Sequence, residues 1–185
     1  MHGDSDYLLF ITPFLYIKKI SFISDSKNGI NILDPYFVTG LTESEGSFSI
    51  TKHKETKAKF GVSIGLRFKI SMLANETDLL RKVQSFFGFG TLGINKDGTV
   101  DFMVKDLSNL LKIKEHFIKY PLRGTKYLDW LDFMYAMSIF EKKIHRTEEG
   151  FNSLVNLSYN MNSYRKDYSN FPPSHTIKYS PNYPY

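Results

Sequence analysis

The stretch FGVSIGLRFKISM, residues 60–72, decides the fold class of this chain. Apolar side chains stand at every even position from Phe60 to Met72, and glycine, serine, arginine and lysine stand at the odd positions between them. A period of two is the pattern of a β-strand that has one face in a core and the other in solvent. We therefore predict a long, half-buried strand with a polar, basic outer face.

The sequence on either side of this strand predicts a two-layer α+β domain. Residues 47–54 alternate in the same way, and Asn95 to Gly98 are typical of the turn of a second hairpin. Apolar residues at helical spacing follow each hairpin, so we expect two hairpins with helices on one face. The predicted elements in chain order are a helix over 35–45, strands over 47–54 and 60–72, a helix over 76–87, strands over 91–95 and 99–105, and helices over 107–120, 125–143 and 148–160.

Two of these helices carry end signals. Asp34 before Pro35 is typical of an N-cap followed by a first-turn proline, and Gly46 is the kind of residue that ends a helix. Thr125 is the predicted cap of the long helix over 125–143. The core candidates on that helix are Leu128, Leu131, Tyr135 and Ile139.

Composition limits the possible functions. The chain has 185 residues, the size of one domain, and a formal charge of +5, which favours a polyanionic partner. It has no cysteine, which excludes disulfides, zinc fingers and a thiol nucleophile, and its five histidines are too far apart for a zinc site.

The two ends differ from the middle in composition. The apolar run over 8–17 contains Pro13 and is shorter than the roughly 20 residues that span a bilayer, so we expect no membrane partner. The end of the chain is rich in proline and tyrosine. We divide the chain into an N-terminal extension over 1–31, a domain over 32–162, and a tail or linker over 163–185.

The segment VTGLTESEG, residues 38–46, carries the chemistry. Glu43 and Glu45 lie in the last turn of the predicted helix, where the helix dipole disfavours carboxylates. A divalent cation would remove this conflict, because Mg²⁺ prefers carboxylate and carbonyl oxygens. Ordinary solvated acids at a helix end would give the same spacing. Gly40 and Ser44 are small and four residues apart, so a second helix could approach closely along that face.

These nine residues resemble the motif of the LAGLIDADG homing endonucleases. They match it with glycine third, leucine fourth, acids sixth and eighth, and glycine ninth. Ser47-Phe48, Asp34-Pro35-Tyr36, the long strand and Tyr120-Pro121-Leu122 extend the likeness, which covers roughly residues 32–162.

The resemblance implies an αββαββα core with a saddle-shaped antiparallel sheet, in which the motif helices of two domains pack together. Glu45 would coordinate the catalytic Mg²⁺, with the main-chain carbonyl of Ser44 as a secondary ligand and two or more ions shared across the paired helices. Lys126 would be the cation that stabilises the transition state, with Arg123 as the alternative. The expected residues of the interface between motif helices are Thr39, Gly40, Glu43 and Ser44, with contacts to neighbouring backbone as a second role for Glu43.

The same resemblance places the outer face of the sheet in the major groove of double-stranded DNA. The candidate DNA contacts are Ser49, Thr51, His53, Ser63, Arg67, Lys69, Asp101, Lys105 and Arg123.

The implied activity is Mg²⁺-dependent, site-specific cleavage of double-stranded DNA in intron homing. The chain has a single motif, so we expect either a homodimer or a second LAGLIDADG domain. Met72 stands where many relatives have a glutamine that helps to position water, and methionine cannot do this. An intron RNA maturase or a non-cleaving nucleic-acid-binding protein of the same fold is therefore the alternative. The Phe-, Tyr- and Lys-rich composition and family habit suggest an organelle-encoded, mitochondrial protein.

Overall fold

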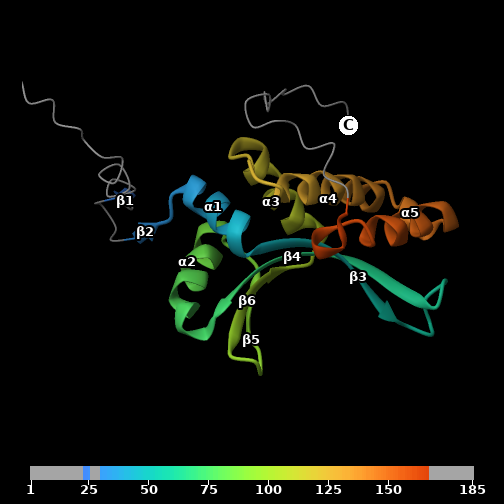
Figure 1. Ribbon diagram of the computed structural model, residues 1–185, viewed down its shortest axis with the longest axis horizontal. Helices are drawn as coiled ribbons and strands as arrows, with labels where there is room; N and C mark the ends of the chain where they lie inside the picture. Colours follow the sequence, from blue (N-terminus) through green and yellow to red (C-terminus); the bar gives the residue numbers. More distant parts are fainter. Residues whose placement is uncertain (1–22, 26–29, 167–185) are drawn as a thin grey trace, which may run out of the picture.

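A four-stranded antiparallel sheet forms the centre of the computed structural model, which describes residues 23–25 and 30–166. The strands lie in the order β3-β4-β6-β5, so β4 and β6 are central (Figure 1). Their bounds are Gly46–Lys54 for β3, Val62–Leu73 for β4, Thr91–Ile94 for β5 and Thr99–Val104 for β6. The two hairpins predicted from the alternating patterns are confirmed.

The start of the long strand differs from the prediction. β4 begins at Val62, two residues after the predicted start, because the chain is still turning at Phe60 and Gly61. Gly61 has a φ of 68°, a left-handed conformation that glycine adopts without a steric cost, and its carbonyl accepts a hydrogen bond of 3.0 Å from the backbone N–H of Glu55. The alternation of apolar residues therefore continues into a tight turn.

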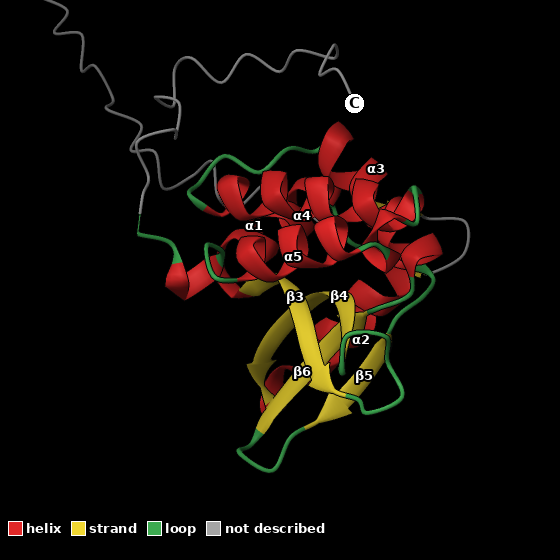
Figure 2. Cartoon of the chain, turned by 90° about the vertical axis from the view of Figure 1, so that its right-hand side faces the viewer, coloured by secondary structure: helices red, strands yellow, loops and turns green. Residues whose placement is uncertain are grey.

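The helices gather on one side of the sheet, as Figure 2 illustrates. Phe48 of β3 and Phe68 of β4 stack at 5.2 Å between ring centroids, and both are fully buried. Trp130 and Phe133 lie 5.2 and 5.4 Å from Phe48 and close the core from the helical side. The bounds of the helices are Pro35–Glu45 for α1, Thr77–Phe87 for α2, Leu107–Lys119 for α3, Lys126–Glu141 for α4 and Glu148–Ser158 for α5.

The ends of α1 follow the predicted signals, with one difference in backbone conformation. The Asp34 carboxylate accepts hydrogen bonds from the N–H groups of Tyr36 and Phe37, which confirms the N-cap. Gly46 ends the helix in an extended conformation and begins β3 directly. A side chain at Gly46 would put its Cβ 2.6 Å from both the methyl group and the carbonyl of Thr42, so the close helix-to-strand junction requires glycine.

α4 departs from the prediction in two ways. Thr125 precedes it but makes no side-chain capping hydrogen bond. Leu128 and Ile139 are buried as expected and Leu131 is half-buried, whereas Tyr135 is 55% exposed. None of the helices in the described part of the chain combines the length and the apolar character that crossing a membrane requires.

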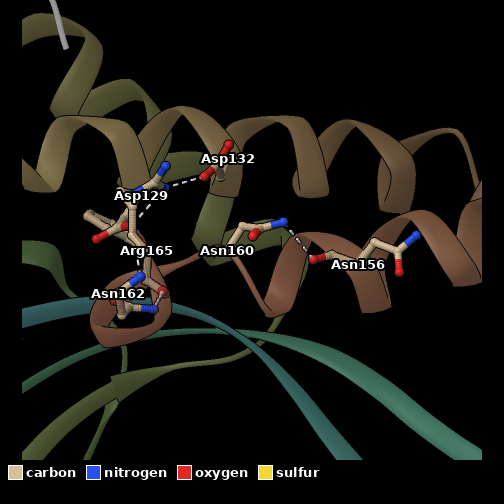
Figure 3. A network of polar contacts seen from close by, with 7 residues as sticks. Asp129, Asp132, Asn156, Asn160, Asn162 and Arg165 are labelled. Atoms are coloured by element: carbon tan, nitrogen blue, oxygen red, sulfur yellow. Dashed lines mark hydrogen bonds and ion pairs between the residues drawn. The ribbon is translucent and has the colours of Figure 1, made fainter. Parts of the chain in front are cut away.

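The described chain ends in a polar network that binds it to α4 and β3 (Figure 3). Arg165 forms ion pairs with Asp129 and Asp132, both on α4. The backbone N–H of Asn162 donates to Asp129 at 2.9 Å, and its side-chain amide donates to the carbonyl of Phe48 at 2.7 Å. These contacts extend the packed chain to Arg165, three residues beyond the boundary predicted at 162.

Two short strands lie in the segment predicted as an N-terminal extension and across its boundary with the domain. β1, Ile23–Asp25, and β2, Ile30–Ile32, form an antiparallel pair that the sequence patterns did not predict. The apolar run over 8–17 lies outside the described residues, as does most of the predicted tail.

Candidate functional site

Three segments that are distant in sequence meet at the C-terminal end of α1. They are the last turn of α1, the first residue of β3, and the loop that leads from Tyr120 into α4. The Lys126 ammonium donates a hydrogen bond of 2.6 Å to the carbonyl of Gly46, the residue that follows Glu45. The fold thus brings Lys126 to the end of the motif helix. We call this junction of residues 43–46 and 123–126 the motif end.

Glu43 connects two sides of the motif end. One of its carboxylate oxygens accepts hydrogen bonds from the backbone N–H groups of Arg123 and Gly124, at 2.5 and 2.7 Å. A Cβ at Gly124 would lie 2.7 Å from the other carboxylate oxygen, so glycine allows this close approach. The role of Glu43 in contacting neighbouring backbone is therefore observed, and its carboxylate holds the loop that begins α4.

Glu45 is arranged differently from Glu43. Its side chain is exposed, and among the described residues its carboxylate makes no hydrogen bond or ion pair. Hard carboxylate and carbonyl oxygens at the end of a helix suit a divalent cation, so the donor chemistry of Glu45 and the Ser44 carbonyl fits a metal ion. The described residues contain no cluster of three or more acidic, histidine or cysteine side chains that could hold a metal ion by itself.

The Lys126 ammonium has hydrogen-bond donors left after its contact with Gly46. An ammonium group has three N–H donors, and the described hydrogen bond to Gly46 uses one of them. The remaining donors can meet an anionic oxygen near Glu45. The Arg123 side chain is exposed, and its backbone N–H is bound by Glu43.

One side of α1 carries small residues with open space around them. Gly40 and Ser44 are both exposed, and a Cβ at Gly40 would meet no atom within 4 Å. Phe37, one turn before Gly40, is 38% exposed. This side of α1 could accept a second helix at close distance.

Thr39 does not lie on that side, which corrects its expected place in the interface between motif helices. Its side chain is 5% exposed, and its hydroxyl donates to the Tyr120 carbonyl at 2.9 Å. The same hydroxyl oxygen lies 3.3 Å from Nε2 of His116. Because the single hydroxyl hydrogen is used by Tyr120, His116 must be the donor in this pair. The hydroxyl is occupied inside the domain because the helix turns this position toward α3.

His116 is a neutral imidazole in this environment. It is 9% exposed and lies among the rings of Phe86, Phe87 and Phe117. Burial lowers the pKa of His116 to about 4. The imidazole therefore packs α3 against the motif helix without carrying a charge at neutral pH.

The outer face of the sheet carries most of the candidate DNA contacts. Antiparallel pairing places Ser49 opposite Arg67 and His53 opposite Ser63, all on the face away from the helices. Thr51 is opposite Gly65, and the absence of a side chain at Gly65 leaves space for the Thr51 side chain. The Arg67 Nε donates to the Ser49 hydroxyl at 3.4 Å, so the two side chains lie in contact. Lys105 is exposed just after β6.

Asp101 is the exception on this face. Its residue is 6% exposed, and its carboxylate is bound by the Ser71 hydroxyl at 2.5 Å and lies 3.5 Å from the Lys69 ammonium. Ser71 was not among the predicted site residues, although its odd position in the alternating pattern placed it on the same face. Met72 points to the opposite side, where it packs against the hydrophobic core.

The sequence of the chain is similar to a known family of endonucleases. The family model described as LAGLIDADG endonuclease matches residues 38–137, which include most of the motif helix α1, both hairpins and most of α4. A probable intron-encoded endonuclease of Neurospora crassa is 35% identical over 126 residues, covering 66% of this chain and 28% of that protein. The chain spans about a third or less of the length of the curated relatives that it matches.

Solved structures give the same result. The homing endonuclease I-TnaI superimposes with a TM-score of 0.68 at 27% identity, over 71% of this chain and 90% of that one. The structure of I-SmaMI bound to an uncleaved DNA target in the presence of calcium ions has a TM-score of 0.67 at 29% identity, over 70% of this chain and 45% of that one. The αββαββα fold expected from the sequence is confirmed.

Proposed function

The chain belongs to the LAGLIDADG endonuclease family, and we propose that it is a site-specific, divalent-metal-dependent endonuclease that hydrolyses both strands of duplex DNA in intron homing. The observation that carries the proposal is the motif end. A carboxylate without a partner in the described chain, Glu45, lies one residue from a carbonyl that binds the Lys126 ammonium. An anion-stabilising cation beside a hard metal ligand suits phosphodiester hydrolysis.

The Glu45 carboxylate and the Ser44 carbonyl are the groups that would hold the metal ion. When bound, a divalent cation lowers the pKa of its water and neutralises charge on the attacked phosphate. Mg²⁺ is our proposed ion because both ligands are hard oxygens. The I-SmaMI structure bound to an uncleaved DNA target was obtained in the presence of calcium ions, which also prefer oxygen ligands.

Lys126 would stabilise the negative charge that develops on the phosphate oxygens. Glu43 supports this role indirectly, because it binds the backbone of Arg123 and Gly124 just before the start of α4. The position of the Lys126 side chain therefore depends on two main-chain contacts, one from Glu43 and one to Gly46. Arg123, exposed in the same loop, remains the alternative cation.

The active assembly needs a second motif helix. The open side of α1, with Gly40 and Ser44, suits the close approach of a similar helix, and Glu43 is exposed enough at its edge to lie near that contact. The second helix would come from a second copy of this chain or from a further LAGLIDADG domain of a longer protein. I-TnaI, which the chain covers almost completely, favours the first arrangement, and the greater length of the curated relatives favours the second.

The outer face of the sheet is the proposed DNA surface. Ser49, Thr51, His53, Ser63 and Arg67 lie in register along β3 and β4, where side chains can reach base edges in the major groove. Lys105 and Arg123 add positive charge that would draw in the phosphate backbone, and Lys69 lies on the same face of β4 as Arg67.

We also propose an intron-encoded, mitochondrial origin for the chain. The N. crassa relative is named as intron-encoded, and a relative from Podospora anserina is named for an intron of ND4. The Phe-, Tyr- and Lys-rich composition supports the same origin.

The test is cleavage of a randomised duplex library with Mg²⁺ by the wild-type chain and by Glu45→Gln. We expect discrete cut sites for wild type, their loss in Glu45→Gln, and retained DNA binding in both. Glu43→Gln is the matched control, because its amide oxygen can still accept from both backbone N–H groups. Binding without cleavage by wild type would contradict the nuclease proposal and favour a maturase or a non-cleaving binding protein.

A further inference from the structure

Asp101 is a buried carboxylate on a face that we propose meets a polyanion. It is 6% exposed, whereas Ser49, Thr51, Arg67 and Lys69 on the same face are half-buried. A carboxylate exposed there would repel the DNA phosphates. Its burial requires partners, because an unpaired charge out of water is costly.

Two side chains supply those partners. Ser71, directly opposite Asp101 across the β4–β6 pair, donates a hydrogen bond of 2.5 Å. The Lys69 ammonium lies 3.5 Å from the same carboxylate oxygen, on the diagonal of that pair. Burial raises the pKa of Asp101, but the hydrogen bond from Ser71 and the charge of Lys69 lower it, and the pKa lies below its ordinary value.

The ion pair with Asp101 restricts the side chain of Lys69. A surface lysine has a flexible four-carbon stem and can pair with any phosphate in reach, which carries no sequence information. The Lys69 side chain is instead held near the sheet, with 26% of its surface exposed. It stands on β4, one of the two central strands, away from the edges of the sheet.

We propose that Asp101 is a positioning residue, which fixes the direction of the Lys69 ammonium so that Lys69 reads an acceptor-bearing base edge, such as guanine O6 and N7, and does not pair with a phosphate. This rests on the proposed function, since it concerns the same DNA surface. Asp101 itself makes no direct contact with a cytosine, because its side chain is only 9% exposed. The role assigned to it from the sequence, a direct DNA contact, is replaced by a role through Lys69.

Arg67 provides the comparison within the same strand. It lies two residues before Lys69 on the same face, but its described partner is the neutral hydroxyl of Ser49 at a long 3.4 Å. No carboxylate reduces its charge in that contact. Arg67 should therefore add to binding of any sequence more than Lys69 does.

The test is a position-resolved selection of duplex DNA by wild type, Asp101→Asn, Lys69→Met and Arg67→Gln. We expect Asp101→Asn and Lys69→Met to lose preference at the same single base pair, by about tenfold. Asp101→Asn should bind non-specific DNA more tightly, with a salt slope steeper by about 1, since it releases one cation. Arg67→Gln should weaken non-specific binding and leave that base pair unchanged. A selection profile of Asp101→Asn identical to wild type would overturn the proposal.

A second measurement does not depend on DNA. Nitrogen relaxation of the lysine ammonium groups should show Lys69 restrained in the wild-type chain and as mobile as Lys105 in Asp101→Asn. If Lys69 is already as mobile as Lys105 in wild type, the positioning role is wrong. Absence of any base preference in wild type would contradict the proposed function, while the ammonium mobility would still decide the role of Asp101. If Asp101→Asn does not fold, Ser71→Ala should give the same changes at smaller size.

Discussion

The motif end and the outer face of the sheet are built with different kinds of contact. At the motif end, side chains bind main-chain groups: Glu43 binds two backbone N–H groups, and Lys126 binds the Gly46 carbonyl. On the outer face, side chains bind each other, as in the pair Ser49–Arg67 and the group Lys69–Ser71–Asp101. Main-chain partners fix the position of loops and helix ends, whereas side-chain partners can be exchanged without moving the backbone. The proposed catalytic groups thus lie where side chains bind the main chain, and the proposed DNA contacts lie where substitutions can exchange the partners.

The largest effect should come from the cation of the motif end. Lys126→Met should reduce cleavage at saturating DNA by about a thousandfold, roughly 4 kcal/mol, because transition-state charge loses a preorganised partner. Lys105→Met, directly after the end of β6, should weaken binding and leave saturated cleavage intact. Single-turnover rates of both variants measure the difference. Equal losses in the two variants would break the distinction between the motif end and the sheet.

The packing behind the motif helix should appear as pH-dependent stability. His116 has a folded pKa of about 4 against an ordinary value of 6.5, so the unfolded chain binds more protons between these pH values. Stability from this group is therefore complete above about pH 6.5 and is lost as pH falls toward 4, by about 3 kcal/mol in total. Urea unfolding at pH 7.5 and pH 4.5 measures the loss.

The control for this titration is His116→Gln, which keeps an N–H donor for Thr39 and does not titrate. It should remove most of the pH dependence over that range. Burial also lowers the pKa of His145, and since this histidine is present in both proteins, its contribution cancels in the comparison. A pH dependence that persists unchanged in His116→Gln would contradict the buried neutral imidazole.

Loss of the Glu43 carboxylate should have an intermediate effect on stability and cleavage. Glu43→Ala leaves the N–H groups of Arg123 and Gly124 without their partner and should cost about 2 kcal/mol of stability, with a further loss of cleavage as Lys126 is displaced. Glu43→Gln should retain most of both. Thermal unfolding and single-turnover cleavage test this, and a Glu43→Ala protein of wild-type stability would show that the loop is held by other contacts.

The smallest effect should come from the outer face. Arg67→Ala should weaken DNA binding by about 1 kcal/mol and reduce the salt slope by about 1, with unchanged thermal stability. Fluorescence anisotropy over a series of salt concentrations measures both quantities. A large loss of stability in Arg67→Ala would mean that this face also depends on its side chains for folding, which would weaken the comparison.

The local patterns of the chain predicted its main helices and strands and the position of its candidate metal ligand. The period of two over residues 60–72 predicted the long strand, and Asp34 predicted the start of the motif helix. The motif placed Glu45 at a helix end. Such features follow from residues within a few positions of each other, because strand alternation, caps and helix dipoles are local properties of the backbone.

The tertiary structure alone decided which partner each functional side chain meets. Thr39 faces inward because α3 supplies His116 and the residue after α3 supplies the Tyr120 carbonyl, about 80 residues later in the chain. Asp101 is buried because the β4–β6 register places Ser71 opposite it and Lys69 on the diagonal. Arg165 belongs to the fold because two aspartates of α4 bind it. These contacts cannot be predicted from a local sequence pattern, because they depend on how separate helices and strands are aligned when they pack together.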